Sequence, residues 1–371
     1  MKKPNGHEII QLFEKFSPKS LAMEGDKIGL QIGRLNQKVK RVMIALDVLE
    51  NVIDEAIEKD VQLIIAHHPP IFRPLKNIIT DTVQGRMIEK LIKHDIAVYA
   101  AHTNLDVAKG GVNDLLADSL GLKEVEVLVP TFETGLKKLV VFVPETHADE
   151  LRRVLGDVGA GYIGNYSHCS FSTSGTGRFM PGENTNPYIG SAGKIEAVDE
   201  VRIETIVPDK LLKKVISAMI KAHPYEEVAY DVYPLENKGE VLGLGRVGKI
   251  DEMTLGEFAE KVKTALDVNH VRVVGDLNTK VTKAAVLGGD GNKYWQHAKF
   301  KGADVYVTGD IYYHTAHDAM MEGLNMIDPG HNVEKIMKKG LTNILLKLCD
   351  EAGYEVEIFP SEINTDPFQF K

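Results

Sequence analysis

The chain has 371 residues, of which 43% are hydrophobic and 26% charged, and its formal net charge at pH 7 is −9. This length is enough for two domains, and the acidic balance argues against nucleic acid as the main partner. The two cysteines, Cys169 and Cys349, are too few for a disulfide framework or an all-thiolate zinc site, which fits a reducing compartment. No run is long and apolar enough for a membrane span and no apolar signal core opens the chain, so we expect a cytoplasmic protein.

The first 129 residues alternate between short apolar runs, typical of buried strands, and amphipathic segments with helical spacing. We expect strands at 40–46, 62–66 and 96–101. The expected helices are 7–16, 51–59, 82–93 and 112–120, the last ending at Gly121 as a C-terminal cap. Such alternation predicts an α/β domain with a doubly wound, mainly parallel sheet.

The sequence pattern changes over residues 130–237. Strands are expected at 137–144, 201–208 and 228–235, helices at 147–155 and 209–222, and a glycine-, serine- and asparagine-rich passage at 156–193. This order is typical of the ferredoxin-like split β–α–β pattern and predicts a separate α+β domain.

The α/β pattern returns after Gly243. Helices are expected at 255–266, 311–321 and 332–348, and strands near 271 and at 284–287 and 305–308. Residues 1–129 and 238–371 are therefore predicted to form one discontinuous domain with one continuous sheet and core, interrupted by the insertion at 130–237.

Candidate metal ligands follow the ends of expected strands. His67 and His68 end an apolar run and precede two prolines, Asp106 follows the strand at 96–101, and His331 and Glu334 are spaced H-x-x-E. In an open parallel sheet the loops at the carboxyl ends of strands meet, and imidazoles with carboxylates suit a hydrolytic metal. Each motif alone has a simpler interpretation. The two histidines could be ordinary polar residues of a loop, Asp106 could cap a helix, and H-x-x-E could be the solvent-exposed first turn of a helix. Together they predict one metal site, in which a carboxylate could bridge two metals.

Other motifs leave alternatives open. The turn Gly288-Gly289-Asp290-Gly291 could present N–H groups to a phosphate or be a plain tight turn, and no Walker-type loop is present. His102 could orient a ligand or relay a proton, or it could pack under Asn104. His317 is expected on the surface, and the role of His314 stays open.

Several of these residues resemble the motifs of a known family. In chain order they are Ala66-His67-His68-Pro69, His102-Thr103-Asn104-Leu105-Asp106, and Gly330-His331 with Glu334. They are similar to motifs of the GTP cyclohydrolase I type 2 family, also called the NIF-three or domain-of-unknown-function-34 family. Residues 25–33 look like its N-terminal signature, with Gly25 and Lys27 where many members carry tryptophan and asparagine. The resemblance covers about 1–130 and 240–371. The insertion, with His223-Pro224-Tyr225-Glu226, resembles the PII/CutA-like domain of the longer, YqfO-like branch.

The resemblance implies a dinuclear centre held by His67, His68, Asp106, His331 and Glu334, inside a homohexamer. Zinc is the first choice for the two divalent ions, with iron or manganese as alternatives. The catalytic acid and base, and the small-molecule substrate or ligand, are not identified by the sequence.

Two functions are compatible with these expectations. One is a metal-dependent hydrolase that acts on a nucleotide or phosphoester, as the cyclohydrolase label of the family suggests. The other is a metal-binding regulatory or scaffold protein without turnover, in which the insertion senses a ligand or partner. A structural metal is usually fully coordinated by the protein, whereas a catalytic metal keeps an open position.

Overall fold

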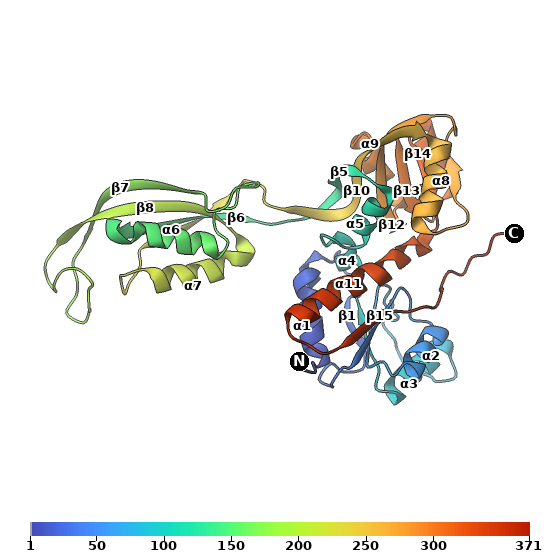
Figure 1. Ribbon diagram of the computed structural model, residues 1–371, viewed down its shortest axis with the longest axis horizontal. Helices are drawn as coiled ribbons and strands as arrows, with labels where there is room; N and C mark the ends of the chain where they lie inside the picture. The colour runs from blue at the N-terminus through green and yellow to red at the C-terminus, as the bar shows by residue number, and fades with distance from the viewer. Residues whose placement is uncertain (1) are drawn as a thin grey trace. The chain divides into compact units, whose positions relative to one another are not determined.

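The computed structural model describes residues 2–371, which form two compact units (Figure 1). The outer unit comprises the chain up to Phe132 and from Leu242 onwards, and the inserted unit is Glu133–Val241. The expected α/β class is confirmed. Within residues 2–371, no helix has both the length and the apolar character needed to cross a bilayer.

The outer unit contains a first sheet with mainly parallel pairing. Its strands, in spatial order, are β1 (Gly29–Ile32), β4 (Ala97–Ala100), β3 (Leu63–Ala66), β2 (Arg41–Ala45) and β15 (Glu357–Pro360). The pairs β15–β2, β2–β3 and β3–β4 are parallel, and β1 joins the edge antiparallel to β4. Because Ala45, Ala66 and Ala100 are paired in register, the loops after β2, β3 and β4 leave from the same edge.

A second sheet in the same unit corrects the expectation of one continuous sheet. Its strands, in spatial order, are β11 (Arg272–Val274), β14 (Asn325–Asp328), β13 (Val305–Gly309), β12 (Lys280–Asp290), β10 (Val241–Thr254) and β5 (Lys123–Glu133). The pairs β12–β13 and β13–β14 are parallel. The edge strands of the first sheet are β1 and β15, and none of the second-sheet strands pairs with either.

Helices pack against both sheets. The α-helices of the outer unit are α1 (Gly6–Phe16), α2 (Glu50–Glu58), α3 (Val83–Lys93), α4 (Thr103–Val107), α5 (Val112–Leu120), α8 (Leu255–Leu266), α9 (Trp295–Phe300), α10 (Tyr313–Met321) and α11 (Ile336–Glu351). Its short 3-10 helices are η1 (Lys19–Leu21), η4 (Asn292–Tyr294) and η5 (His331–Lys335). Gly121 ends α5 with a left-handed backbone, as the sequence predicts.

One core joins the two sheets of the outer unit. It includes Ile65 from the first sheet, Val307 from the second, and Leu116, Leu341 and Leu345 from helices α5 and α11. Figure 1 shows α11 crossing between the two sheets. The prediction of a shared core is therefore correct, although the prediction of a single sheet is wrong.

The inserted unit is an antiparallel sheet with two helices. Its strands, in spatial order, are β7 (Ser170–Phe179), β8 (Glu196–Pro208), β6 (Leu136–Pro144) and β9 (Tyr230–Leu235). Its two α-helices are α6 (Ala148–Asp157) and α7 (Leu212–Ala222), each preceded by a short 3-10 helix, η2 (Glu145–His147) and η3 (Asp209–Leu211). The strand β7 lies within the passage 156–193, where little periodicity is present in the sequence. Nearly all residues of β7 are exposed, so the strand has no apolar face that would produce an alternating pattern.

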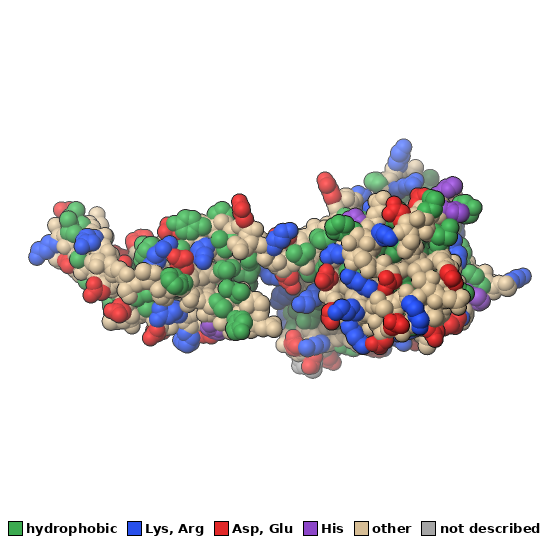
Figure 2. All heavy atoms as spheres, turned by 90° about the horizontal axis from the view of Figure 1, so that it is seen from above, with side chains coloured by type: hydrophobic (Ala, Val, Ile, Leu, Met, Phe, Trp, Pro, Cys, Tyr) green, Lys and Arg blue, Asp and Glu red, His purple; other side chains and the backbone are tan. Residues whose placement is uncertain are grey.

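The surface of the outer unit carries charges of both signs. Figure 2 shows lysine and arginine side chains interspersed with aspartate and glutamate over the visible face. On this face the basic side chains are mixed with acidic ones and are not gathered into one basic patch.

Candidate metal centre

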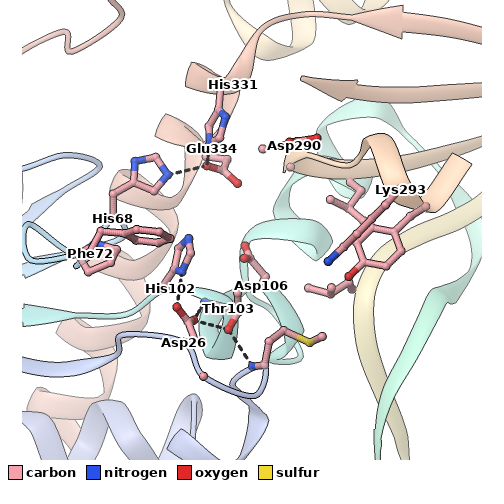
Figure 3. Close-up of a pocket in the computed structure, with 18 of the residues that line it drawn as sticks. Asp26, His68, Phe72, His102, Thr103, Asp106, Asp290, Lys293, His331 and Glu334 are labelled. Carbon is pink, nitrogen blue, oxygen red and sulfur yellow. Dashed lines mark hydrogen bonds and ion pairs between the residues drawn. The ribbon is translucent and has the colours of Figure 1, made fainter. Parts of the chain in front are cut away.

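Five side chains expected to be metal ligands lie together in the outer unit (Figure 3). His67 and His68 directly follow β3, Asp106 lies in α4, and His331 and Glu334 lie in η5 after β14. The sequence predicted that His331 and Glu334 begin an α-helix. They lie instead on a 3-10 turn that precedes α11. The carboxyl edges of the two sheets therefore supply the cluster jointly.

Two atoms in this cluster are buried without a hydrogen-bond partner. They are Nε2 of His67 and Oδ1 of Asp106, which lie 3.6 Å apart, too far for a hydrogen bond. Two ligand atoms of one tetrahedral zinc ion, each about 2.1 Å from the metal, are separated by roughly 3.4 Å. Buried polar atoms are normally satisfied, so this spacing fits a metal ion between the two side chains.

Glu334 lies at the centre of the cluster. Its Oε1 is 3.6 Å from Nε2 of His67, while its Oε2 is 3.0 Å from Nε2 of His68 and 3.3 Å from Nε2 of His331. The two oxygens thus face different histidines. The group His67, Asp106 and Glu334 and the group His68, His331 and Glu334 could each hold a metal ion, with the carboxylate shared between them.

The three histidines are oriented by hydrogen bonds at their other ring nitrogen. Nδ1 of His67 donates to the carbonyl oxygen of Ala101 at 2.8 Å. Nδ1 of His68 lies 2.6 Å from Oδ1 of Asp47, and the same distance separates Nδ1 of His331 from Oδ2 of Asp310. Each partner leaves Nε2 directed into the cluster, which is the arrangement usual for histidine ligands.

His102 adds a fourth imidazole to the cavity. Its Nδ1 is 2.8 Å from Oδ1 of Asp26, and the other oxygen of Asp26 accepts from the backbone N–H of Thr103 at 3.0 Å. Figure 3 shows the remaining ring nitrogen of His102 pointing towards the cluster, and it can share a metal site with His67 and His68. The amide of Asn104 donates to Ser17 and not to His102.

The pKa values of the cluster are shifted because several ionisable side chains lie close together and are buried. Burial raises the pKa of Asp106 to about 6, against the opposing effect of His67. Burial also opposes ionisation of Glu334, but His67, His331 and His68 outweigh it and hold the pKa of this carboxyl well below its ordinary value. Burial lowers the pKa of His68, yet Asp47 and Glu334 raise it overall to about 10. In the metal-free protein, protons on the histidines thus supply the positive charge that a metal cation would supply in this cluster.

Glycines make room for the cluster. A Cβ at Gly289, whose φ is +66°, would lie 2.8 Å from Oε1 of Glu334 and 3.2 Å from Nε2 of His331. A Cβ at Gly309 would lie 2.9 Å from the backbone of His331. Glycine in the turn at 288–291 thus lets the backbone lie close to the carboxylate of Glu334. The sequence alone did not indicate this role of the turn.

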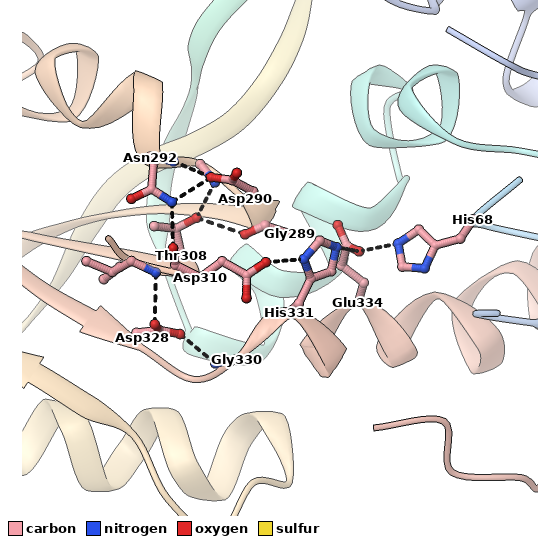
Figure 4. Close-up of polar contacts among 12 residues, drawn as sticks. His68, Gly289, Asp290, Asn292, Thr308, Asp310, Asp328, Gly330, His331 and Glu334 are labelled. Carbon is pink, nitrogen blue, oxygen red and sulfur yellow. Dashed lines mark hydrogen bonds and ion pairs between the residues drawn. The ribbon is translucent and has the colours of Figure 1, made fainter. Parts of the chain in front are cut away.

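The segment that carries His331 is fixed by a second set of polar contacts, shown in Figure 4. Asp328 accepts hydrogen bonds from the backbone N–H groups of Ile311 at 2.9 Å and Gly330 at 2.8 Å. Asp310, which holds His331, has a positive φ of 57°. The turn after β13 is therefore tied to the turn after β14.

The cluster opens into a cavity of about 680 Å³. Its walls include the aromatic rings of Phe72 and Tyr294 and the amine of Lys293, which Figure 3 shows pointing into the cavity. This volume lies in the range of small-molecule sites, about 300–1,000 Å³. His314 and His317 are exposed on α10 and do not line the cavity, so neither joins the cluster.

Comparisons with known proteins place the chain in a family. The model of the family described as Duf34/NIF3 (NGG1p interacting factor 3) matches residues 4–367. The chain belongs to the Duf34/NIF3 family. It is 63% identical over 370 residues to a Bacillus subtilis protein and 62% identical over 371 residues to one from Halalkalibacterium halodurans, both named GTP cyclohydrolase 1 type 2 homolog. The alignments cover all of this chain and 99% and 100% of those relatives.

A solved structure gives the same result for the fold. The crystal structure of a Bacillus cereus protein related to NIF3 is 64% identical, covers 100% of both chains and superposes with a TM-score of 0.94. The family resemblance seen in the sequence motifs is therefore confirmed for this Duf34/NIF3 chain.

Proposed function

We propose that this Duf34/NIF3 protein is a metal-dependent hydrolase whose dinuclear centre is held by His67, His68, Asp106, His331 and Glu334. The observation that carries the proposal is the pair of buried, unpartnered ligand atoms, Nε2 of His67 and Oδ1 of Asp106, beside the shared carboxylate of Glu334. A cation would satisfy both atoms and neutralise the two acidic groups.

The chemistry supplied by two divalent ions is Lewis acidity towards a phosphoryl or ring-carbon electrophile. The protein contributes the cavity and its orientation. His102, held by Asp26, presents its second nitrogen to the cavity as a hydrogen-bonding group for the substrate. Phe72 and Tyr294 offer aromatic surface, and Lys293 offers a cation for an anionic group. These features support a nucleotide or another phosphoester as the substrate class.

Zinc is the proposed metal, with iron or manganese as alternatives, because histidine–carboxylate sites do not select sharply among these ions. Cys169 and Cys349 are not in the groups that could hold a metal ion within residues 2–371. Elemental analysis of protein purified without added metal would identify the ion and its number per subunit. Only one equivalent, or less, of divalent transition metal per subunit after full reconstitution would contradict the dinuclear centre.

The test of hydrolase function is an assay of the metal-loaded protein against nucleotides and phosphoesters, including GTP because of the name of the relatives. His67→Ala and Glu334→Gln should each abolish turnover while the fold is retained. His317→Ala, an exposed histidine on α10, is the matched control and should leave turnover unchanged. Equal turnover in the Glu334→Gln variant would overturn the proposed site.

A second candidate function is a metal-binding regulatory or scaffold protein without turnover. It is favoured by a separate cavity in the inserted unit, about 330 Å³, which could sense a ligand. This candidate predicts that metal removal lowers the melting temperature while no nucleotide or phosphoester is consumed. Turnover that follows metal content would exclude it.

The domain organisation and assembly are part of the proposal. We propose that residues 130–237 are a ferredoxin-like, PII/CutA-like domain inserted into the α/β domain formed by 1–129 and 238–371. We also propose a cytoplasmic homohexamer, whose closed symmetry would bring several metal centres around one interior. Light scattering at micromolar concentration should give about six times the mass of the 41.0 kDa chain, and a monomer would contradict the proposed assembly.

A further inference from the structure

The inserted unit contains a cavity of its own. It lies between the end of β7, the segment 180–189 that follows, and the loop between α7 and β9. Its volume of about 330 Å³ is at the lower end of the range for small-molecule sites. None of its walls belongs to the metal centre.

Three aromatic rings form one side of this cavity. The ring of Tyr225 is central: the centroid of Phe179 lies 5.7 Å away at an interplanar angle of 60°, and that of Tyr188 lies 6.4 Å away at 49°. The three rings are tilted rather than stacked on one another, and Tyr225 and Tyr188 also meet the rings of His223 and His147 in T-shaped contacts. Aromatic faces carry partial negative charge, and a group of such faces is the usual recognition surface for ammonium ions.

The charged side chains of the cavity are mainly acidic. Three carboxylates, those of Glu200, Glu226 and Glu227, line it together with one guanidinium, that of Arg178. Glu200 accepts a hydrogen bond from the hydroxyl of Tyr225 at 3.0 Å, and Glu226 accepts from the backbone N–H of Asn186 at 2.9 Å. These contacts position both carboxylates but leave their charge intact, so the cavity attracts cations.

The acidic and aromatic walls are held in place by specific packing. A Cβ at Gly177 would lie 2.2 Å from Oε2 of Glu200, so glycine at this position lets the carboxylate keep its place. The buried His223 accepts a hydrogen bond at Nδ1 from the backbone N–H of Tyr225 and donates from Nε2 to the carbonyl of Phe142. The central ring is therefore fixed at its backbone and at its hydroxyl.

We propose that this cavity binds a small organic cation, an ammonium group that carries alkyl or aromatic substituents. The substituents would lie against Phe179, Tyr188 and Tyr225, and the positive charge would face Glu200 and Glu227. The site is distinct from the metal centre and does not depend on the proposed hydrolase activity.

The experiment uses the full chain and isothermal titration with two probes of the same shape. Choline carries a quaternary ammonium, and 3,3-dimethyl-1-butanol is its neutral counterpart; benzyltrimethylammonium tests the aromatic wall. We expect both cations to bind, benzyltrimethylammonium more tightly, and the neutral probe to bind at least about tenfold more weakly than choline. Chelator-treated and metal-loaded protein should bind the cations equally, because the metal centre is not involved.

Variants locate the binding in this cavity. Glu200→Gln and Glu227→Gln should each weaken cation binding about tenfold, and Tyr225→Phe should weaken it less than Tyr225→Leu because it keeps the ring. Glu183→Gln is the matched control: it removes the same charge from the segment 180–189, at a position that does not line the cavity, and should leave binding unchanged. Equal binding of the neutral probe, or no cation binding because a neighbouring copy fills the cavity, would overturn the proposal.

Discussion

The carboxylate of Asp47 lies 2.6 Å from Nδ1 of His68, and this contact turns Nε2 of the imidazole towards Glu334. The other oxygen of Asp47 accepts a hydrogen bond from the hydroxyl of Thr365 at 2.5 Å. A residue of the C-terminal segment therefore supports a side chain of the candidate metal centre through one intervening carboxylate.

Asp47→Asn should lower metal affinity about 10–100-fold, because an amide holds the imidazole less firmly and makes it a weaker ligand. Thr365→Val should give a smaller loss in the same direction, and Thr365→Ser, which keeps the hydroxyl, should resemble the wild type. Competition with a chromophoric chelator measures all three affinities. If Thr365→Val and Thr365→Ser bind metal equally well, the hydroxyl contact has no role in positioning His68.

Metal binding should release at least two protons per subunit near pH 7.5. In the metal-free protein, Asp47 and Glu334 raise the pKa of His68 to about 10 against the effect of burial, and Glu334 raises that of His331 to about 9. Both rings must lose their proton to bind a cation. Titration calorimetry in buffers of different ionisation enthalpy measures the release. A binding enthalpy that is the same in every buffer would contradict this prediction.

The same raised pKa values give the metal-free protein a pH-dependent stability. His68 and His331 bind protons more tightly in the folded than in the unfolded chain, so their contribution is fully present below about pH 6.5. It is lost as the pH rises through about 9 and 10. Stabilisation by added metal should therefore increase over this range. Melting curves with and without metal between pH 6.5 and 10 provide the measurement, and a constant difference would count against it.

Gly289→Ala should abolish metal binding, because the added Cβ would lie 2.8 Å from Oε1 of Glu334 and displace the shared carboxylate. Its positive φ of 66° adds a strain of about 1–2 kcal/mol. Gly302→Ala is the matched control: its φ is +72°, but nothing lies within 4 Å of the added atom. Both variants should lose similar stability, and only the first should lose metal. Retention of metal by Gly289→Ala would show that the carboxylate can move aside.

The candidate ligands were easier to predict from the sequence than the residues that orient them by hydrogen bonds. His67, His68 and Asp106 follow apolar runs, and the shared edge of parallel strands is enough to bring such residues together. Asp47 also follows a strand, but only the register of β2 against β3 shows that its carboxylate meets His68. Thr365 could not be predicted, because its segment has no periodicity and its contact spans 318 positions.

The fold shows the same distinction between local and long-range information. Helix α8 (Leu255–Leu266) has the expected bounds, since its apolar spacing and the capping box of Thr254 and Glu257 are local signals. The first sheet includes β15, which returns to the edge of β2 in a pairing between residues more than 300 positions apart. The spacing of apolar residues along the chain does not indicate which distant strands pair.

His223 should make the inserted unit less stable at acid pH. Burial lowers the pKa of His223 below its ordinary value of about 6.5. The unfolded chain then binds the proton more tightly, so stability is present above pH 6.5 and is lost as the pH falls through the lower folded pKa. Hydrogen exchange of the β9 segment (Tyr230–Leu235) should increase between pH 7 and pH 5 in the wild type, relative to His223→Gln at the same pH. Identical exchange in both proteins at pH 5 would exclude this effect.

Removal of the inserted unit should leave the outer unit folded and able to bind metal. The two ends of the insertion are adjacent, because the backbone N–H of Thr134 donates to the carbonyl of Glu240 at 2.9 Å, and β5 and β10 are neighbours in the second sheet. A short Asn-Gly turn can therefore replace residues 135–239 and close a hairpin. The shortened protein should keep the metal affinity of the full chain and lose binding of benzyltrimethylammonium. The same deletion with Glu334→Gln is the control for metal binding. Insoluble protein, or soluble protein without metal, would show that the outer unit depends on the insertion.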